Sequence, residues 1–127
     1  MAKEAHVLVI EDDSHALDII ATRLKAAGYA VITAGDAWEG VVRAKGVPLG
    51  LVITDIMMPG GGSGIDGYKR LRSMSKRLPV IFVTGMSLQA VRSLIPDDPK
   101  ARVLGKPIKF QEIHQAIKEL TGIDRPL

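Results

Sequence analysis

Acidic residues directly follow two short apolar runs in this 127-residue chain. Glu11, Asp12 and Asp13 come after the first run, and Asp55 comes after a later one. Carboxylates about 4 Å apart repel each other by several kcal/mol near a protein surface, so a cluster of them needs a cation or raised pKa values. Hard oxygen ligands with no histidine or cysteine beside them favour Mg²⁺, which takes carboxylates together with water and phosphate oxygens. These acids therefore predict a magnesium site, provided that the fold brings them together.

A hydroxyl and an ammonium group complete the set of side chains that suggest chemistry. Thr84 closes an apolar run in the second half of the chain, and Lys106 follows the last such run, directly before Pro107. A lysine and a threonine beside a metal suit the oxygens of a phosphoryl group. The chemistry predicted is phosphoryl transfer onto the carboxylate of Asp55, which is a form of covalent catalysis.

Five short apolar runs are the elements that must position these side chains. They cover residues 6–10, 30–34, 51–54, 80–84 and 102–105. Most of them are rich in valine and isoleucine, and runs that are apolar on both faces favour a buried parallel sheet over an alternating antiparallel one.

Stretches with helical periodicity separate these runs. We expect helices from a cap at Ser14 to a stop at Gly28, over 37–45, from Asp66 to Leu78, over 87–95, and from Phe110 to Leu120. The alternation predicts an α/β fold, a (βα)5 doubly wound five-stranded parallel sheet with helices on both faces and right-handed crossovers. In such a sheet ligands bind at the carboxyl ends of the strands, which is where the acids, the threonine and the lysine would meet.

Length and composition predict a single domain over residues 1–127, with a core at about 5–122. A chain that is 46% apolar and 24% charged is an ordinary globular protein, which excludes a disordered tail, a collagen-like rod and a coiled coil. Without cysteine it cannot form disulfides, zinc–thiolate sites or iron–sulfur clusters. No apolar stretch approaches the roughly 20 residues of a membrane helix, so we expect a cytoplasmic protein with no membrane partner.

The net charge of +3 is unevenly spread, with twelve bases and six acids in residues 56–127. A basic domain raises nucleic acid as a partner, but five aromatic residues offer little base-stacking surface, so we expect no direct nucleic-acid binding. One half of the third helix would carry Lys69, Arg70, Arg72, Lys76 and Arg77. The simpler interpretation of these bases is a solvated face, and the alternative is a docking surface for an acidic partner.

Three residues near these features have structural interpretations. Asp13 is expected to cap a helix rather than to bind metal, because acids suit the first turn electrostatically. Trp38 and Met74 are expected to pack against their neighbours.

Taken together, four segments resemble the receiver domains of two-component response regulators. They read VLVIEDD over 7–13, DIMMP over 55–59, VTG over 83–85 and KP over 106–107. The match covers nearly the whole chain, in order and with family-like spacing. The resemblance implies a flavodoxin-like fold with its strands in the order 2-1-3-4-5, and a cis peptide bond between Lys106 and Pro107.

The resemblance also implies a role for each candidate site residue. Asp55 would accept a phosphoryl group from a phosphohistidine of a sensor histidine kinase or a histidine phosphotransfer protein, and Thr84 and Lys106 would hold the phosphoryl oxygens. Mg²⁺ would be bound by Asp55, by Asp12 directly, by Glu11 through water and by the carbonyl of Met57.

Two departures from the family concern how the signal leaves the site. Val103 stands where the family has an aromatic residue that moves on phosphorylation, and the loop over 60–65 is longer than usual. Because valine has no ring to swing and a stiff side chain, we expect the signal in residues 85–90 and in 60–65 instead.

The function predicted is a phosphorylation-dependent signalling switch, a monomer or weak dimer that acts on a downstream protein. It would not be an enzyme beyond its own phosphoryl transfer and hydrolysis. One alternative is a small Mg²⁺-dependent haloacid-dehalogenase-like phosphatase, although such enzymes have an acid at the position of Met57. A flavodoxin-like cofactor binder would need a phosphate-cradling loop that opens a helix. The last alternative is a receiver that is part of a longer hybrid kinase or regulator.

Overall fold

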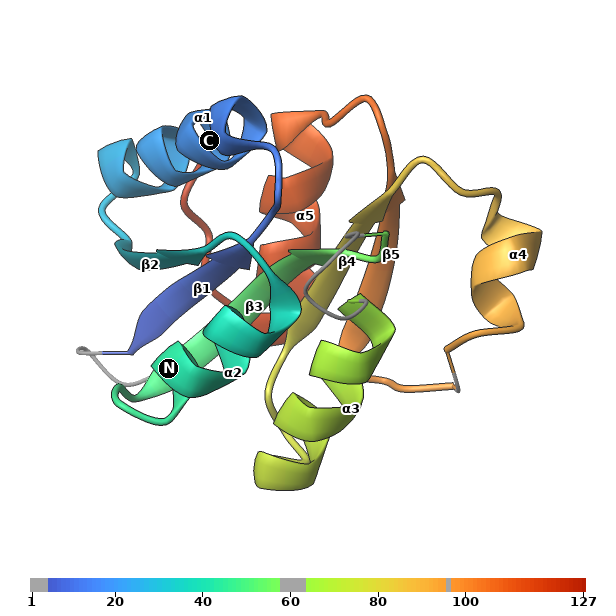
Figure 1. The fold of residues 1–127 in the computed structure, drawn as a ribbon. Helices are drawn as coiled ribbons and strands as arrows, with labels where there is room; N and C mark the ends of the chain where they lie inside the picture. The colour runs from blue at the N-terminus through green and yellow to red at the C-terminus, as the bar shows by residue number, and fades with distance from the viewer. Residues whose placement is uncertain (1–4, 58–63, 96) are drawn as a thin grey trace.

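Strands and helices alternate along the chain in the order that the apolar runs predict (Figure 1). The computed structural model describes residues 5–57, 64–95 and 97–127. Its strands are β1 (His6–Ile10), β2 (Ala30–Ala34), β3 (Leu49–Asp55), β4 (Val80–Thr84) and β5 (Ala101–Gly105). Its helices are α1 (Ser14–Ala26), α2 (Ala37–Ala44), α3 (Gly64–Met74), α4 (Leu88–Arg92) and α5 (Phe110–Thr121).

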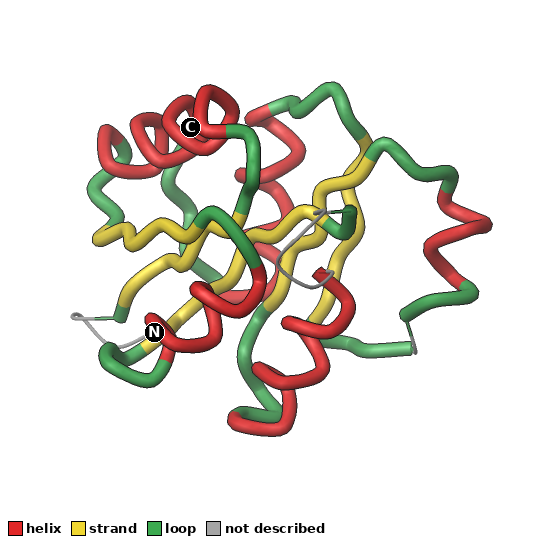
Figure 2. The backbone as a smooth tube through the Cα atoms, viewed as in Figure 1, coloured by secondary structure: helices red, strands yellow, loops and turns green. Residues whose placement is uncertain are grey.

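The strands form one parallel sheet in the order β2-β1-β3-β4-β5, which confirms the predicted doubly wound α/β fold. Figure 2 shows the strands between layers of helices. α1 and α5 bury one apolar cluster against one face, and α2 and α3 bury a second cluster against the other. The central strands are therefore covered on both sides, which explains their continuous apolar runs. No helix among the described residues has both the length and the apolar character that a membrane crossing requires.

Of the two cap residues expected for α1, Asp13 and not Ser14 is the N-cap. The Asp13 carboxylate accepts hydrogen bonds from the backbone N–H groups of His15 (2.9 Å) and Ala16 (3.3 Å). The expected capping role of Asp13 is thus confirmed, and Ser14 becomes the first helical residue.

Both ends of α3 also differ from the prediction. The helix begins at Gly64 instead of Asp66 and ends at Met74. Leu78 is buried but lies in the following loop, not on the helix. Pro79 comes directly after Leu78, and a proline disfavours helical backbone in the residue before it.

Two further elements have shifted boundaries. β3 begins two residues before the expected 51–54 run and ends one residue after it, while β5 begins one residue early. α4 is shorter than the expected 87–95 at both ends: Ser87 is its N-cap and accepts a hydrogen bond from the Ala90 N–H (3.2 Å), and Ser93 is its C-cap.

The packing expected of Trp38 and Met74 is wrong in both cases. Trp38 is 52% exposed and Met74 is 45% exposed, although both lie on helices that cover the sheet. Helical spacing alone does not say which flank of a helix a neighbouring element will cover.

Candidate functional site

The carboxyl ends of four neighbouring strands bring the candidate residues to one edge of the sheet. β1 ends beside Thr54 of β3, and Asp55 at the end of β3 pairs with Val83 of β4. Thr84 ends β4, and Lys106 directly follows β5. The predicted convergence at this edge is therefore what the sheet order produces.

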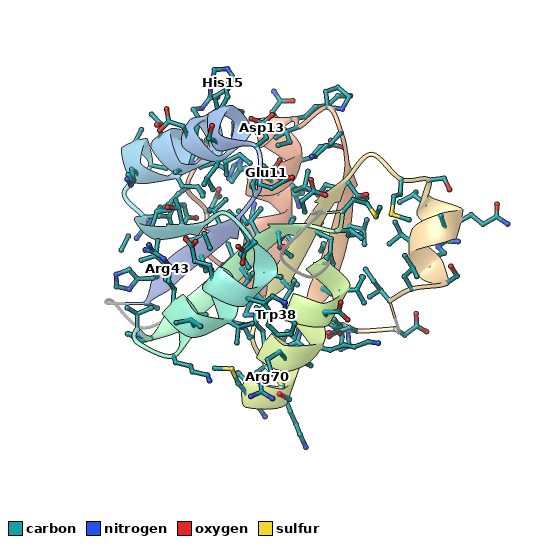
Figure 3. All side chains as sticks on the ribbon, in the orientation of Figure 1. Glu11, Asp13, His15, Trp38, Arg43 and Arg70 are labelled. Atoms are coloured by element: carbon teal, nitrogen blue, oxygen red, sulfur yellow. The ribbon has the colours of Figure 1, made fainter. Side chains whose placement is uncertain are left out.

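Three carboxylates meet there. Glu11, Asp12 and Asp55 each offer an oxygen, and these oxygens all lie within 4.8 Å of one another. Glu11 is only 4% exposed and Asp55 only 7%, whereas Asp12 is exposed. Figure 3 shows the labelled Glu11 nearest the sheet, with Asp13 and His15 further out toward solvent. The buried pair thus carries charge where water is scarce.

Lys106 joins the two buried acids. Its Nζ donates a hydrogen bond to Asp55 Oδ2 at 2.5 Å and another to Glu11 Oε1 at 3.2 Å. The backbone completes the arrangement, since the Met57 N–H donates to Asp55 Oδ1 (3.1 Å) and the Asp12 N–H donates to Glu11 Oε2 (3.1 Å). Asp55 is therefore fixed at both of its oxygens.

Burial and neighbouring charges shift the pKa values of Glu11 and Lys106. Burial, followed by the charge of Asp55, raises the pKa of Glu11 to about 6, against the opposing effect of Lys106. Burial alone would lower the pKa of Lys106, but its hydrogen bond to Asp55 and the charges of both acids raise it. One ammonium group thus contacts two carboxylates of a cluster of three, and it does not cancel the rise in the pKa of Glu11.

The donor set fits Mg²⁺. Carboxylate oxygens are the hard ligands that this ion prefers, and the exposed position of Asp12 leaves the cluster open to water and to a phosphate. A divalent cation would also supply the positive charge that Lys106 alone lacks.

Thr84 lies at the same edge, one strand away from Asp55. It is 1% exposed, and its Oγ1 accepts a hydrogen bond from the Met86 N–H (3.0 Å). The carbonyl of Thr84 accepts a hydrogen bond from the Lys106 N–H (2.8 Å), which ties the residue after β5 to the end of β4. The Lys106–Pro107 peptide bond is cis, as the resemblance implies.

α3 begins against the backbone of Asp55, and a glycine permits this. The Gly64 N–H donates to the carbonyl of Ile56 (2.9 Å), and a Cβ at Gly64 would lie 1.9 Å from the carbonyl oxygen of Asp55. A side chain at this position cannot be accommodated without moving the helix or the end of β3. Of the loop expected to carry the signal, residues 60–63 lie outside the described part of the chain.

Sequence reasoning missed a second polar cluster below this edge. The Asp98 carboxylate accepts hydrogen bonds from the Tyr68 hydroxyl (2.5 Å) and from Arg72 Nε (3.0 Å). Arg72 is therefore half-buried and ion-paired, which corrects its assignment to a solvated face of α3. Asp98 is 26 and 30 residues away from its partners in sequence, so no local pattern could have found them.

Comparison with known proteins agrees with this geometry. Residues 7–118 match the response regulator receiver domain family. The uncharacterized transcriptional regulatory protein YkoG of Bacillus subtilis is 29% identical over 122 residues, and YrkP of the same organism is 35% identical over 115 residues. These matches cover 91% and 87% of this chain but only 50% and 47% of the relatives, so the chain spans about half of their length.

Solved structures show the same fold. A response regulator receiver domain protein from Clostridium thermocellum is 28% identical with a TM-score of 0.76, covering 93% of this chain and 94% of that one. A CheY-like receiver domain protein from Methanospirillum hungatei is also 28% identical, with a TM-score of 0.79 and coverages of 92% and 93%. None of these matches supports the haloacid-dehalogenase-like phosphatase that the sequence left open.

Proposed function

Since the chain belongs to the response regulator receiver domain family, we propose that it is a phosphorylation switch whose acceptor is Asp55 and which requires Mg²⁺. The observation that carries this proposal is the ammonium group of Lys106 on Asp55, inside a cluster of three carboxylates at the strand ends. A carboxylate held at both oxygens, with a cation beside it where phosphoryl oxygens would come, supports Asp55 as the acceptor.

The transfer follows from these positions. An oxygen of Asp55 attacks the phosphorus of a phosphohistidine, the P–N bond breaks, and the released imidazole takes up a proton. Lys106 Nζ, already 2.5 Å from Asp55 Oδ2, is within reach of an oxygen on a phosphoryl group attached to Asp55. The oxygen of the Thr84 hydroxyl accepts the Met86 N–H, and its O–H would donate to a second phosphoryl oxygen.

Mg²⁺ would supply positive charge to the phosphoryl oxygens and would be held by Glu11, Asp12, Asp55 and the carbonyl of Met57. The hydrogen bond from the Met57 N–H to Asp55 places Met57 beside the acceptor. Burial first and the charge of Asp55 second raise the pKa of Glu11, and a cation at the cluster would offset both, because it favours the charged form of the carboxyl.

The phosphodonor would be a histidine kinase or a histidine phosphotransfer protein. A recess of about 410 Å³ opens beside the acids between α1 and the start of α5. Ile19, 43% exposed, and Phe110 line this recess together with Asp12 and Lys106. A recess that is lined by apolar side chains and by Lys106, the residue bonded to Asp55, suits a partner protein better than a small molecule, because the partner could dock there and bring its histidine to Asp55.

We propose the remaining features on the same basis. Residues 1–127 form a single receiver unit, a monomer or weak dimer, which signals through a downstream protein rather than by binding nucleic acid directly. The transcriptional regulatory proteins among its relatives favour a cytoplasmic location. Its only chemistry would be the formation and loss of its own phosphoryl group.

Intact-protein mass measurement tests the proposed function. After incubation with acetyl phosphate and Mg²⁺, the protein should gain the mass of one phosphoryl group, and chelation of Mg²⁺ should prevent the gain. Asp55→Asn should gain nothing, whereas the control Asp18→Asn, which removes an exposed carboxylate from α1, should behave like the wild type. Labelling that persists in Asp55→Asn or after chelation would contradict the proposal.

A further inference from the structure

Large apolar side chains are exposed along the junction of α2 and α3. Trp38 is 52% exposed, Val42 is 67% exposed and Met74 is 45% exposed. Scattered apolar residues are normal on a protein surface, but three large ones on two adjoining helices form a patch. Such a patch is typical of a protein interaction site.

The two helices are in close contact, so the three side chains belong to one surface. A Cβ at Gly67 of α3 would lie 3.0 Å from the Cβ of Ala37 in α2. Met74 is seven residues after Gly67, which places it on the same side of α3 as this contact. Met74 also lines a recess of about 170 Å³ together with Ala44, at the end of α2, and Leu71.

Trp38 and Val42 lie on the flank of α2 that faces away from the sheet. Gly40, on the other flank, packs against the sheet, since a Cβ there would lie 2.5 Å from Ile10 Cδ1. Trp38 and Val42 are four residues apart, one turn of the helix, and share the outward flank. Figure 3 shows the labelled Trp38 beside the junction of the two helices, with Arg70 below it on the same side.

Two basic residues lie at the edge of the apolar patch. Lys45 is seven residues, or two helical turns, after Trp38 and lies on the same flank as Trp38. Arg70 is one turn before Met74 and lies on the same flank of α3 as Met74. Neither Lys45 nor Arg70 has an ion-pair partner among the residues that the structure describes. We name Trp38, Val42, Lys45, Arg70 and Met74 the α2–α3 face.

The acids of α2 do not neutralise this face. Glu39 is paired with Arg43 at 3.3 Å, and the Asp36 side chain caps α2 by accepting the Glu39 N–H at 2.8 Å. Further exposed bases, Lys76 and Arg77, follow the end of α3. The face therefore has an apolar centre with the bases Lys45 and Arg70 at its edge, and Asp66, exposed on α3 one turn before Arg70, is an acid on the same flank.

We propose that the α2–α3 face binds an acidic amphipathic helix of a partner protein. Such a helix would cover Trp38, Val42 and Met74 with its apolar side and would bring carboxylates to Lys45 and Arg70. A second copy of this chain fits less well, because a symmetric contact would bring the bases of both copies together. This site goes beyond the proposed phosphorylation switch and does not depend on Asp55.

Trp38 makes the test direct, because it is the only tryptophan in the chain. The probe is a synthetic helical peptide whose leucines are spaced alternately three and four residues apart, so that they share one face of the helix, with glutamate at the other positions. The matched peptides are one with lysine in place of glutamate and one with the same acidic composition in scrambled order. We expect the acidic amphipathic peptide to shift Trp38 emission to the blue, saturably, with a Kd between about 1 and 100 µM in low salt.

Two variants locate the contact. Arg70→Glu should raise the Kd at least about tenfold, and Val42→Ser should raise it severalfold, because they remove the charge and the apolar contact respectively. The matched control is Lys25→Glu on α1, which makes the same change of charge on the other side of the sheet and should leave the Kd unchanged. Circular dichroism of each variant reports whether it is folded.

Several results would overturn the proposal. These are no saturable shift with the acidic peptide, an equal shift with the lysine or scrambled peptide, or an unchanged Kd in a folded Arg70→Glu. A shift that appears without peptide as the protein concentration rises, with dimers in sedimentation, would assign the face to a second copy. A shift with anionic lipid vesicles but not with the peptide would assign it to a membrane. Asp55→Asn should bind the peptide like the wild type, so the outcome is independent of the phosphorylation test.

Discussion

Replacing Asp98 by alanine should lower the free energy of unfolding by about 3 kcal/mol, because several groups depend on its carboxylate. The Tyr68 hydroxyl (2.5 Å), Arg72 Nε (3.0 Å) and the Lys100 N–H (2.9 Å) all donate to it. Arg72 Nη2 adds an ion-pair contact at 2.7 Å, with the Asp98 side chain 11% exposed and that of Arg72 18% exposed.

The magnitude follows from what the substitution leaves behind. Removing one partner of a buried ion pair costs about 3–5 kcal/mol, because the other charge remains without compensation. Arg72 lies near the surface and keeps hydrogen bonds from Nη1 to the carbonyls of Ser75 (3.1 Å) and Leu78 (2.6 Å), which favours the low end of that range. Tyr68→Phe removes one hydroxyl and should cost only about 1 kcal/mol, since the edge-to-face contact with Phe82 remains.

The pH dependence of this effect has a definite sign. Burial opposes ionisation of Asp98, but the Tyr68 hydrogen bond, the Lys100 N–H and Arg72 together lower the pKa of its carboxyl. The carboxylate therefore stabilises the fold above the unfolded pKa of about 3.9, and this stabilisation is lost as the pH falls through the lower folded value. The difference between the wild type and Asp98→Ala should accordingly shrink below about pH 4.

Urea unfolding of the wild type, Asp98→Ala, Tyr68→Phe and the double variant measures these free energies. The two single changes should not add, because both remove the same hydrogen bond. Equal midpoints for the wild type and Asp98→Ala, or a difference that stays constant into acid, would refute the reasoning.

Three further outcomes are expected. Because the pKa of Glu11 is raised to about 6, Mg²⁺ affinity measured by calorimetry should fall as the pH drops through that value; an affinity constant from about pH 7 to pH 5 would contradict this. Met57 and Met86 cannot orient a water, so Met57→Asn with Met86→Glu should shorten the lifetime of the phosphorylated protein, and an unchanged lifetime would remove the argument. When beryllofluoride is added as a phosphoryl mimic, the largest changes in amide chemical shift should fall in residues 85–90. Changes centred on Val103 would contradict the prediction that the signal bypasses this position.

The sheet and its edge could be predicted because their signals are local. Apolar runs on both faces indicate buried parallel strands, and such a sheet brings the residues that follow its strands to one edge. This reasoning placed Glu11, Asp55 and Lys106 in one site, although it could not give the distances between their side chains. The bounds of α3 were less predictable. The helix begins at Gly64 because a glycine can approach the Asp55 backbone closely, and this contact exists only in the folded chain.

Contacts between distant segments account for the rest. Arg72 has the helical position of a solvated base, but its ion pair with Asp98, 26 residues later in the sequence, holds it against the protein. Trp38 is a large aromatic residue of the kind that packs in protein cores. No described element covers its flank of α2, however, and Trp38 is 52% exposed. In both cases the sequence gives the position of the residue on its helix, but it does not give the distant segment that packs, or fails to pack, against it.

Mapping the phosphorylated residue tests the central claim most directly. After reaction with acetyl phosphate and Mg²⁺, borohydride reduction converts an aspartyl phosphate to homoserine, which peptide mass spectrometry locates. Homoserine should appear at position 55 alone, and Lys106→Ala, which removes the ammonium group bonded to Asp55, should reduce its yield. Homoserine at Asp12 or elsewhere, or none at position 55 in a protein that has gained a phosphoryl group, would contradict the assignment of Asp55 as the acceptor.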